Sequence, residues 1–278
     1  MLEVKNLTFG YRKSAPVISD LSLTLGEGCV YGLLGRNGTG KSTLLYLAMG
    51  LLRPQSGTIL MDGREPQQRL PETLQEMFIV PEEYDLPSIS LANYVKSIRP
   101  FYPRFSDETL RQSLSSFDMP LDLHLGALSM GQKKKVYMSV ALAANTKVLL
   151  MDEPTNGLDI PSKAQFRKVM AGGMDESKTV VISTHQVRDV ETLLDHLCVI
   201  DQNRVLLNDS MERVGRSLRF VMVPGTQLPD ETVYAEQVFG GFNAILPSAT
   251  GEETPINLEL LFNALLYNND RVQAALLP

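Results

Sequence analysis

The chain has 278 residues, 44% of them hydrophobic, which is enough to bury a full core and to form one large domain or a domain with an appendage. Its 26 Lys and Arg residues against 32 Asp and Glu residues give a net charge of −6, so no nucleic-acid partner is expected. The first residues lack the pattern of a signal peptide, and no apolar run reaches the roughly 18 residues of a spanning helix. We therefore expect a chain that does not cross a membrane by itself.

The first third of the chain predicts strands, a glycine loop and a helix. Residues 2–9 and 18–25 alternate as half-buried strands do. Residues 30–34 form an apolar run typical of a buried strand. Cys29 and Cys198 each lie in an apolar run, so we expect both to be buried thiols rather than the two halves of a disulfide. A loop over 35–40 then leads into a helix over 41–49, closed by Gly50.

This loop matches the phosphate-binding pattern G-x-x-x-x-G-K-[ST] in its strand-to-helix context. Glycines let backbone N–H groups close around phosphate oxygens, and the helix N-terminus and Lys41 add positive charge. Ser42 can place its hydroxyl on a magnesium ion. The predicted nucleotide-binding residues of the loop are Gly35, Asn37, Gly38, Thr39, Gly40, Lys41, Ser42 and Thr43.

Two adjacent carboxylates end a second apolar run, "VLLMDE", at Asp152 and Glu153. Neighbouring negative charges at the end of a buried strand need a cation, a proton or hydrogen bonds to compensate them. Lys41 of the phosphate loop and a magnesium ion bound there would compensate these two charges. We expect Asp152 to hold the same magnesium ion, directly or through water, and Glu153 to polarise the water that attacks the γ-phosphate.

Three further motifs occur in order, and with them the chain resembles the ATP-binding cassette (ABC) ATPases over about residues 1–205. "LSMGQ" at 128–132 is similar to the family signature L-S-G-G-Q, with Met130 in place of the first glycine. "NGLD" at 156–159 resembles the D-loop, which contains Asp159, and "STH" at 183–185 resembles the switch-histidine motif. The resemblance implies a catalytic role for His185 beside the γ-phosphate.

The signature also has a physical interpretation, because Ser129 can cap a helix over 130–144 whose free N–H groups form a second anion site. The resemblance implies that Ser129, Gly131 and Gln132 grip ATP bound to a partner subunit, so that hydrolysis requires a head-to-tail dimer. The run of lysines at 133–135 is interpreted as a solvated helix face.

The aromatic residues near the start of the chain and the three histidines are assigned next. Tyr11 lies where the family places an aromatic residue that stacks on adenine; Phe9 is the competing candidate, and core packing of Tyr11 is the other possibility. His185 is expected to follow a strand and begin another helix. His124 and His196 match no motif and are taken as structural.

One position departs from the family pattern, since Glu82 aligns where a glutamine is usual. Glutamate keeps the acceptors that magnesium needs but loses the amide donor, so we expect Glu82 to take part in a magnesium-dependent cycle. Residues 87–145 resemble the family's helical subdomain, whose junction with the core docks a helix of the membrane-spanning partner. Docking and core packing remain equally open for its aromatic and apolar candidates, which are Tyr84, Leu86, Phe101 and Tyr102.

The last quarter changes character. Residues 216–246 alternate as short strands, 246–255 are rich in turn residues, and "INLELLFNALL" at 256–266 predicts an amphipathic helix. This part resembles the small C-terminal extensions of ATPases that serve ABC-2-type exporters. It contains no catalytic constellation and is interpreted as a dimerisation, docking or regulatory appendage.

The sequence thus predicts an α/β P-loop NTPase of the ABC type over residues 1–207, with an antiparallel β subdomain and a helical subdomain, and an α+β extension over 208–278. Its expected function is Mg-dependent ATP hydrolysis that drives transport through a separate membrane-spanning subunit, as a homodimer or heterodimer on the inner face of the membrane. A soluble ABC-type ATPase that acts as an assembly scaffold is the alternative. The transported substrate is not encoded in these motifs.

Overall fold

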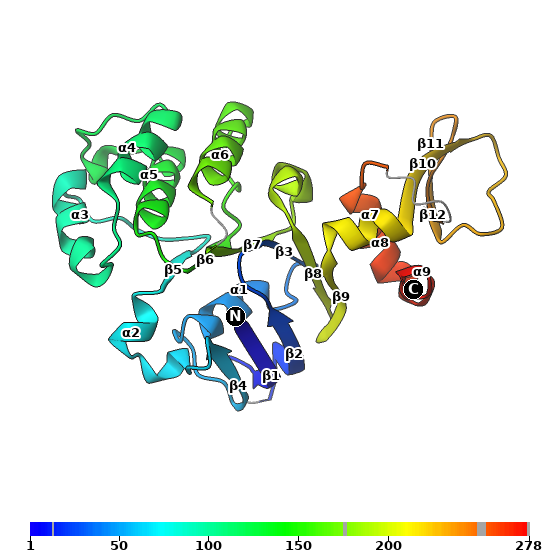
Figure 1. The fold of residues 1–278 in the computed structure, drawn as a ribbon, viewed down its shortest axis with the longest axis horizontal. Coiled ribbons are helices and arrows are strands. Elements are labelled where there is room, and N and C mark those ends of the chain that lie inside the picture. The colour runs from blue at the N-terminus through cyan, green and yellow to red at the C-terminus, as the bar shows by residue number, and fades with distance from the viewer. Residues whose placement is uncertain (13, 175–176, 249–253, 277–278) are drawn as a thin grey trace.

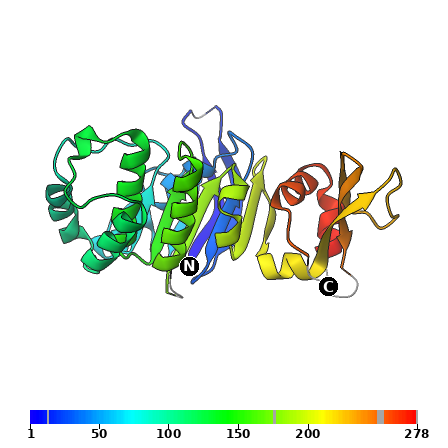
Figure 2. The ribbon, with the colours of Figure 1, turned by 90° about the horizontal axis from the view of Figure 1, so that it is seen from above.

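A computed structural model describes residues 1–12, 14–174, 177–248 and 254–276. Three parts lie in a row along the molecule: a helical part, a central two-sheet core and a C-terminal extension (Figures 1 and 2). Part of the predicted turn over 246–255, at residues 249–253, lies outside the described residues. Within the described residues, no helix combines the length and apolar character needed to cross a bilayer.

The central sheet has six strands, of which only the last is antiparallel to its neighbour. In spatial order they are β5 (Met77–Val80), β6 (Val148–Asp152), β7 (Thr179–Thr184), β3 (Val30–Leu34), β8 (His196–Asp201) and β9 (Arg204–Ser210). The inner strands are apolar throughout because a parallel sheet is covered on both faces. The strand predicted over 30–34 is confirmed.

A second sheet covers one face of the central sheet. It is antiparallel, in the order β2 (Ile18–Leu25), β1 (Leu2–Phe9) and β4 (Ser56–Met61), and its first two strands have the predicted bounds. The helix α1 (Lys41–Ala48) packs between the sheets, and alternate strand residues such as Leu33 and Val181 belong to this core.

Helices cover the opposite face, where Leu34 and Ile182 point. The helices nearest the sheet are α5 (Met130–Ala143) and α6 (Ile160–Gly173). In the helical part beside the sheet, α4 (Asp107–Ser116) packs against α5 and α6, and α3 (Leu91–Ile98) lies farther out (Figure 1); the short α2 (Pro71–Leu74) precedes β5. Their starts are fixed locally, because a side-chain oxygen accepts a backbone N–H three residues ahead at each of the caps Ser90, Ser106, Ser129 and Asp159.

The extension follows β9, which stays in the central sheet as far as Ser210, past the predicted boundary at residue 207. A three-stranded antiparallel sheet packs against helices (Figure 1). Its elements are α7 (Met211–Ser217), β10 (Leu218–Pro224), β11 (Tyr234–Val238), β12 (Gly241–Pro247), α8 (Leu258–Tyr267) and α9 (Asn269–Leu276). The predicted strands therefore begin at residue 218, and the predicted helix is confirmed as α8.

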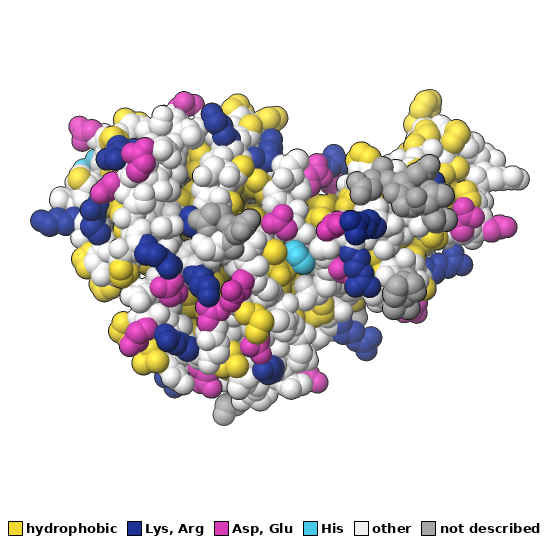
Figure 3. Space-filling view, viewed as in Figure 1, with side chains coloured by type: hydrophobic (Ala, Val, Ile, Leu, Met, Phe, Trp, Pro, Cys, Tyr) yellow, Lys and Arg dark blue, Asp and Glu magenta, His cyan; other side chains and the backbone are white. Residues whose placement is uncertain are grey.

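Side chains of both charges are interspersed on the face that Figure 3 shows. This distribution agrees with the modest net charge of −6.

Candidate functional site

The phosphate loop leaves β3 at Leu34 and enters α1 at Lys41. Gly38 and Gly40 have φ of 81° and 92°, in the left-handed region that glycine adopts without strain. The Lys41 ammonium is buried and donates to the carbonyls of Gly35, at 2.7 Å, and Arg36, at 3.2 Å. Burial lowers the pKa of Lys41, whereas the charges of Glu153, Asp152 and Glu82 act in the opposite direction. The loop is thus closed around its own cation.

A second cation anchors the loop from outside. The Arg36 guanidinium makes a two-pronged contact with the carboxylate of Asp201 at the end of β8, with Nε 2.9 Å from Oδ1 and Nη2 2.6 Å from Oδ2. The Thr39 hydroxyl donates to the Arg36 carbonyl. The sequence does not indicate the Arg36–Asp201 contact, because Asp201 lies 165 residues along the chain and belongs to no motif.

Asp152 ends β6 in a position suited to a cation. Its side chain is 1% exposed, and neither carboxylate oxygen has a hydrogen-bond partner among the described residues. Burial raises the pKa of this carboxyl, and the nearby hydroxyls of Ser42 and Ser183 offset the shift in part. Unpartnered carboxylate oxygens beside a hydroxyl are ligands that Mg²⁺ accepts, so these residues fit the predicted ion. The described residues contain no group of three or more His, Cys, Asp or Glu side chains that would hold a metal alone.

Glu153 is held far more firmly than its neighbour. It has a φ of 46°, uncommon for a residue with a side chain and of the kind found at functional sites. Its carboxylate accepts hydrogen bonds from the Thr184 hydroxyl, at 3.0 Å, and the His185 backbone N–H, at 3.0 Å, and lies 2.7 Å from His185 Nδ1. These groups meet because β6 and β7 are adjacent parallel strands that end at the same edge.

His185 does lie at the end of a strand, but the helix expected after it is wrong. The chain continues in two 3-10 turns, Val187–Asp189 and Glu191–Leu193. The ring is half-exposed and faces the site, since it contacts Glu153.

A cavity of about 340 Å³ brings most of the predicted residues together. Its lining includes Asn37, Gly38, Gly40, Lys41, Ser42, Thr43, Glu82, Glu153 and His185. Tyr11 lies beside this group, with its hydroxyl 3.3 Å from Thr43 Oγ1. At 64% exposure Tyr11 is not a core residue, whereas Phe9 is buried. The ring is therefore free to stack on a flat ligand.

The signature residues lie outside this cavity. Ser129 caps α5 in a capping box, in which Gln132 N–H donates to Ser129 Oγ and the Gln132 side chain accepts from Ser129 N–H. Gly131 lines a separate cavity of about 200 Å³ that it shares with Glu82 and Gly157. Asp159 caps α6 by accepting the Ser162 N–H, at 3.0 Å. The start of α5 is thus capped by its own side chains, and the signature residues do not line the phosphate-loop cavity of the same chain.

The interpretation of the lysine run at 133–135 as a solvated face is wrong for Lys134. Lys134 is 7% exposed, and its ammonium donates to the carbonyls of Glu153 and Asn156. Lys135 bonds Gln165 and the carbonyl of Phe117. The error has a geometric cause: α5 is covered by core on more than one side, so a uniform charge run cannot mark its solvent face.

The docking candidates divide into two kinds. Leu86 is buried, and Tyr84 and Tyr102 are half-buried and pack against the core. Phe101 is 69% exposed. Burial excludes Leu86 as a surface residue, and Phe101 alone keeps the exposure that docking requires.

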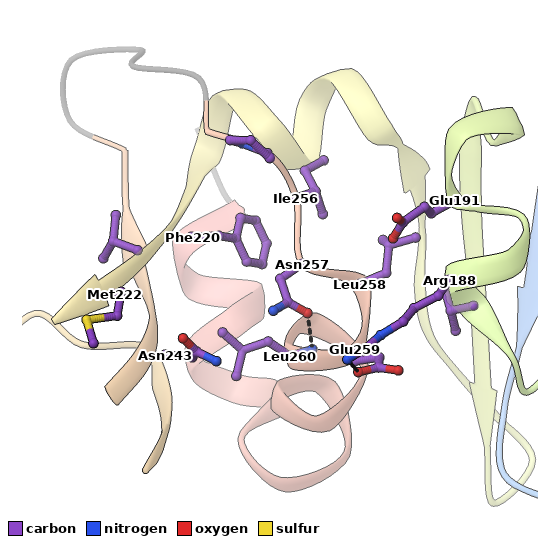
Figure 4. Close-up of a pocket in the computed structure, with 13 residues that line it drawn as sticks. Arg188, Glu191, Phe220, Met222, Asn243, Ile256, Asn257, Leu258, Glu259 and Leu260 are labelled. Carbon is purple, nitrogen blue, oxygen red and sulfur yellow. Dashed lines mark hydrogen bonds and ion pairs between the residues drawn. The ribbon is translucent and has the colours of Figure 1, made fainter. Parts of the chain in front are cut away.

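The extension meets the core at the turn that contains Arg188 (Figure 4). Arg188, in the turn that follows His185, forms an ion pair with Glu259 of α8. Between them and β10 lies an open cavity of about 450 Å³ lined by side chains that include Phe220 and Ile256. Asn257 caps α8 through the Leu260 N–H.

A model of the family described as "ABC transporter" matches residues 18–156, half of the chain. The chain belongs to the ABC transporter family. That match spans the phosphate loop, the signature, Asp152 and Glu153.

Similar proteins agree with this assignment. The chain is 31% identical to the ABC transporter ATP-binding protein YtrB of Bacillus subtilis over 67% of this chain and 64% of that protein. It is 32% identical to the Nod factor export ATP-binding protein I of Burkholderia lata over 68% of this chain and 64% of that protein. A solved ATP-binding subunit of an ABC transporter has the same fold, with a TM-score of 0.68 and 24% identity over 78% of this chain and 92% of that one. The chain thus spans about 64% of the length of these two sequence relatives.

Proposed function

We propose that this ABC family chain binds Mg-ATP at the phosphate loop and hydrolyses it to ADP and phosphate. The observation that supports this most is the convergence of Lys41, Glu153 and His185 on one cavity, with Asp152 unpartnered beside it. A phosphate-binding loop needs a cation, a metal ligand and a base to perform phosphoryl transfer to water.

Each residue then has a separate task. The loop N–H groups and Lys41 neutralise phosphate oxygens, and Tyr11 stacks on adenine. Glu153 accepts a proton from the attacking water, with His185 beside it to orient the water and contact the γ-phosphate. Ser42 and Asp152 would hold Mg²⁺, with Glu82 as a further ligand, and the bound ion would supply positive charge against the negative charge that develops during the reaction.

A dimer completes the site. The helix start at Ser129 and Gly131 lies outside the cavity of its own chain, yet its N–H groups suit an anion. A second cassette arranged head to tail would bring its signature to the γ-phosphate. ATP shared across the interface would then stabilise the dimer.

Membrane transport is the wider proposal. The Burkholderia relative is named an export ATP-binding protein, which favours a role of this chain in export. We propose that the chain lies on the inner face of the membrane, drives a separate membrane-spanning subunit, and uses the exposed Phe101 region as part of its docking surface.

The first test measures phosphate release by the purified chain with Mg-ATP, beside the variant Glu153→Gln. Removing a general base slows turnover by about 10²–10⁴-fold. The variant should still bind ATP and should accumulate as an ATP-dependent dimer in light scattering. Near-normal turnover of the variant would refute Glu153 as the base, and no turnover in either protein, alone or with membranes, would refute the hydrolase.

The partner is tested in the native cell. Tagged protein extracted in mild detergent should retain a multi-spanning membrane protein in stoichiometric amount, and Phe101→Ala should weaken that association. Soluble partners alone would overturn the transporter proposal in favour of an assembly scaffold.

A further inference from the structure

Lys134 makes contacts that the proposed reaction has not used. Its Nζ lies 2.9 Å from the carbonyl oxygen of Glu153 and 2.9 Å from that of Asn156, which are 19 and 22 residues further along the chain. Both carbonyls belong to the turn between β6 and α6. One side chain of the signature helix therefore binds the backbone of the residue assigned as the base.

The ammonium is committed to these two carbonyls rather than to an ion pair. In the part of the chain that the structure describes, the hydrogen bonds of Lys134 Nζ go to these two carbonyls, although the side chain is almost wholly buried. Burying a cation is unfavourable unless hydrogen bonds and nearby negative charge compensate it. Glu82, Glu153 and Asp152 supply that charge at longer range, with Glu82 the largest contributor.

Glu82 extends the connection toward the nucleotide cavity. The Asn156 side-chain amide donates to the Glu82 carboxylate, at 2.9 Å. Glu82 in turn lines both the phosphate-loop cavity and the smaller cavity beside Gly131. Lys134, Asn156 and Glu82 thus join three segments that the sequence separates.

We propose that Lys134 is a positioning residue for ATP hydrolysis, which holds the backbone of Glu153 so that its carboxylate faces the attacking water. The backbone of Glu153 is left-handed at a residue with a side chain, a conformation that needs outside contacts to persist. Its carboxylate has three contacts on the side of β7, while Lys134 fixes the main chain from the side of α5. Losing either set would let the carboxylate turn.

This placement also connects the two half-sites of one chain, an inference that rests on the proposed dimer. Lys134 is one turn into the helix whose start would grip the partner's ATP. Lys134 therefore joins the helix that would bind the partner's ATP to the main chain of the residue assigned as the base.

The test compares Lys134→Met, which keeps the aliphatic stem, with Lys133→Met, the matched control one residue away on the same helix. Turnover is measured per bound ATP, so loss of folded protein alone does not lower it. For K134M we expect a roughly tenfold lower kcat, which corresponds to about 1.4 kcal/mol of barrier, with the Kd for ATP within about threefold of the parent. K133M should match the parent in both.

Lys134→Arg gives the rescue. The cavity beside Lys134 offers space for a guanidinium, whose donors can reach the same carbonyls, so K134R should recover most of the lost kcat. Unchanged kcat per bound ATP in K134M, or an equal loss in K133M, would overturn the positioning role. Absence of hydrolysis in the parent protein would instead refute the proposed function, so the two failures are distinguishable.

Discussion

The phosphate loop and the start of the signature helix each bury one lysine, and the two lysines resemble one another closely. Lys41 and Lys134 are both 7% exposed, both donate to two backbone carbonyls, and both have a pKa lowered by burial. They differ in reach. Lys41 bonds carbonyls five and six residues away in its own loop, whereas Lys134 bonds a turn that follows another strand. The same chemistry therefore serves a local ligand cradle in one place and a long-range connection in the other.

This comparison predicts different failures for the two lysines, and the largest concerns Lys41→Met. Hydrogen bonds to charged groups contribute about 1.5–3 kcal/mol, so loss of the ammonium should weaken ATP binding about 10–100-fold. Fluorescence titration with a nucleotide analogue measures the effect directly. Equal Kd values for K41M and the parent would show that the loop backbone alone binds the phosphates, and would remove the contrast with Lys134.

The next effect concerns Asp152, whose charge acts on both Lys41 and Lys134. Burial raises the pKa of Asp152, so the unfolded chain loses this proton at lower pH than the folded chain. Without a cation, the folded protein therefore loses stability as pH rises from the ordinary value through the raised one, and the penalty remains at neutral pH. Asp152→Asn removes that penalty.

We expect D152N to raise the melting temperature of the nucleotide-free protein at pH 7 by a few degrees, since about 1 kcal/mol shifts a chain of this size by roughly 2–4 °C. In the parent, adding Mg²⁺ together with ATP should raise the melting temperature further than ATP alone, and a chelator should abolish that further rise. In D152N the further rise should be absent. Scanning calorimetry with and without chelator checks both. A lower melting temperature without nucleotide would show that the Asp152 charge is already compensated.

The smallest effect is expected for Glu82→Gln. The amide oxygen of glutamine can still accept from Asn156, so the hydrogen-bonded connection survives while one negative charge is lost. Turnover should change by less than about threefold, far less than in K134M. A tenfold loss measured in the same phosphate assay would mean that the charge of Glu82, rather than its hydrogen bond, sustains Lys134.

The local elements could be predicted from the sequence with good precision. Alternation gave β1 and β2, the apolar run gave β3, and the spacing of glycines and Lys41 placed the loop between that strand and α1. These features depend on residues within one turn or one pleat of each other, and their side-chain types state the backbone conformation directly. The family followed from the same motifs.

Contacts across the fold were decided only by the tertiary structure. Nothing in a run of three lysines says that the middle one is buried, because that depends on which sides of α5 the core covers. The pairs Arg36–Asp201 and Arg188–Glu259 join segments 165 and 71 residues apart, and no local pattern encodes them. The sequence determined the family and the candidate groups for the chemistry, since these depend on residue type and spacing. The packing of strands and helices decided which backbone each group contacts, since that depends on distance in space.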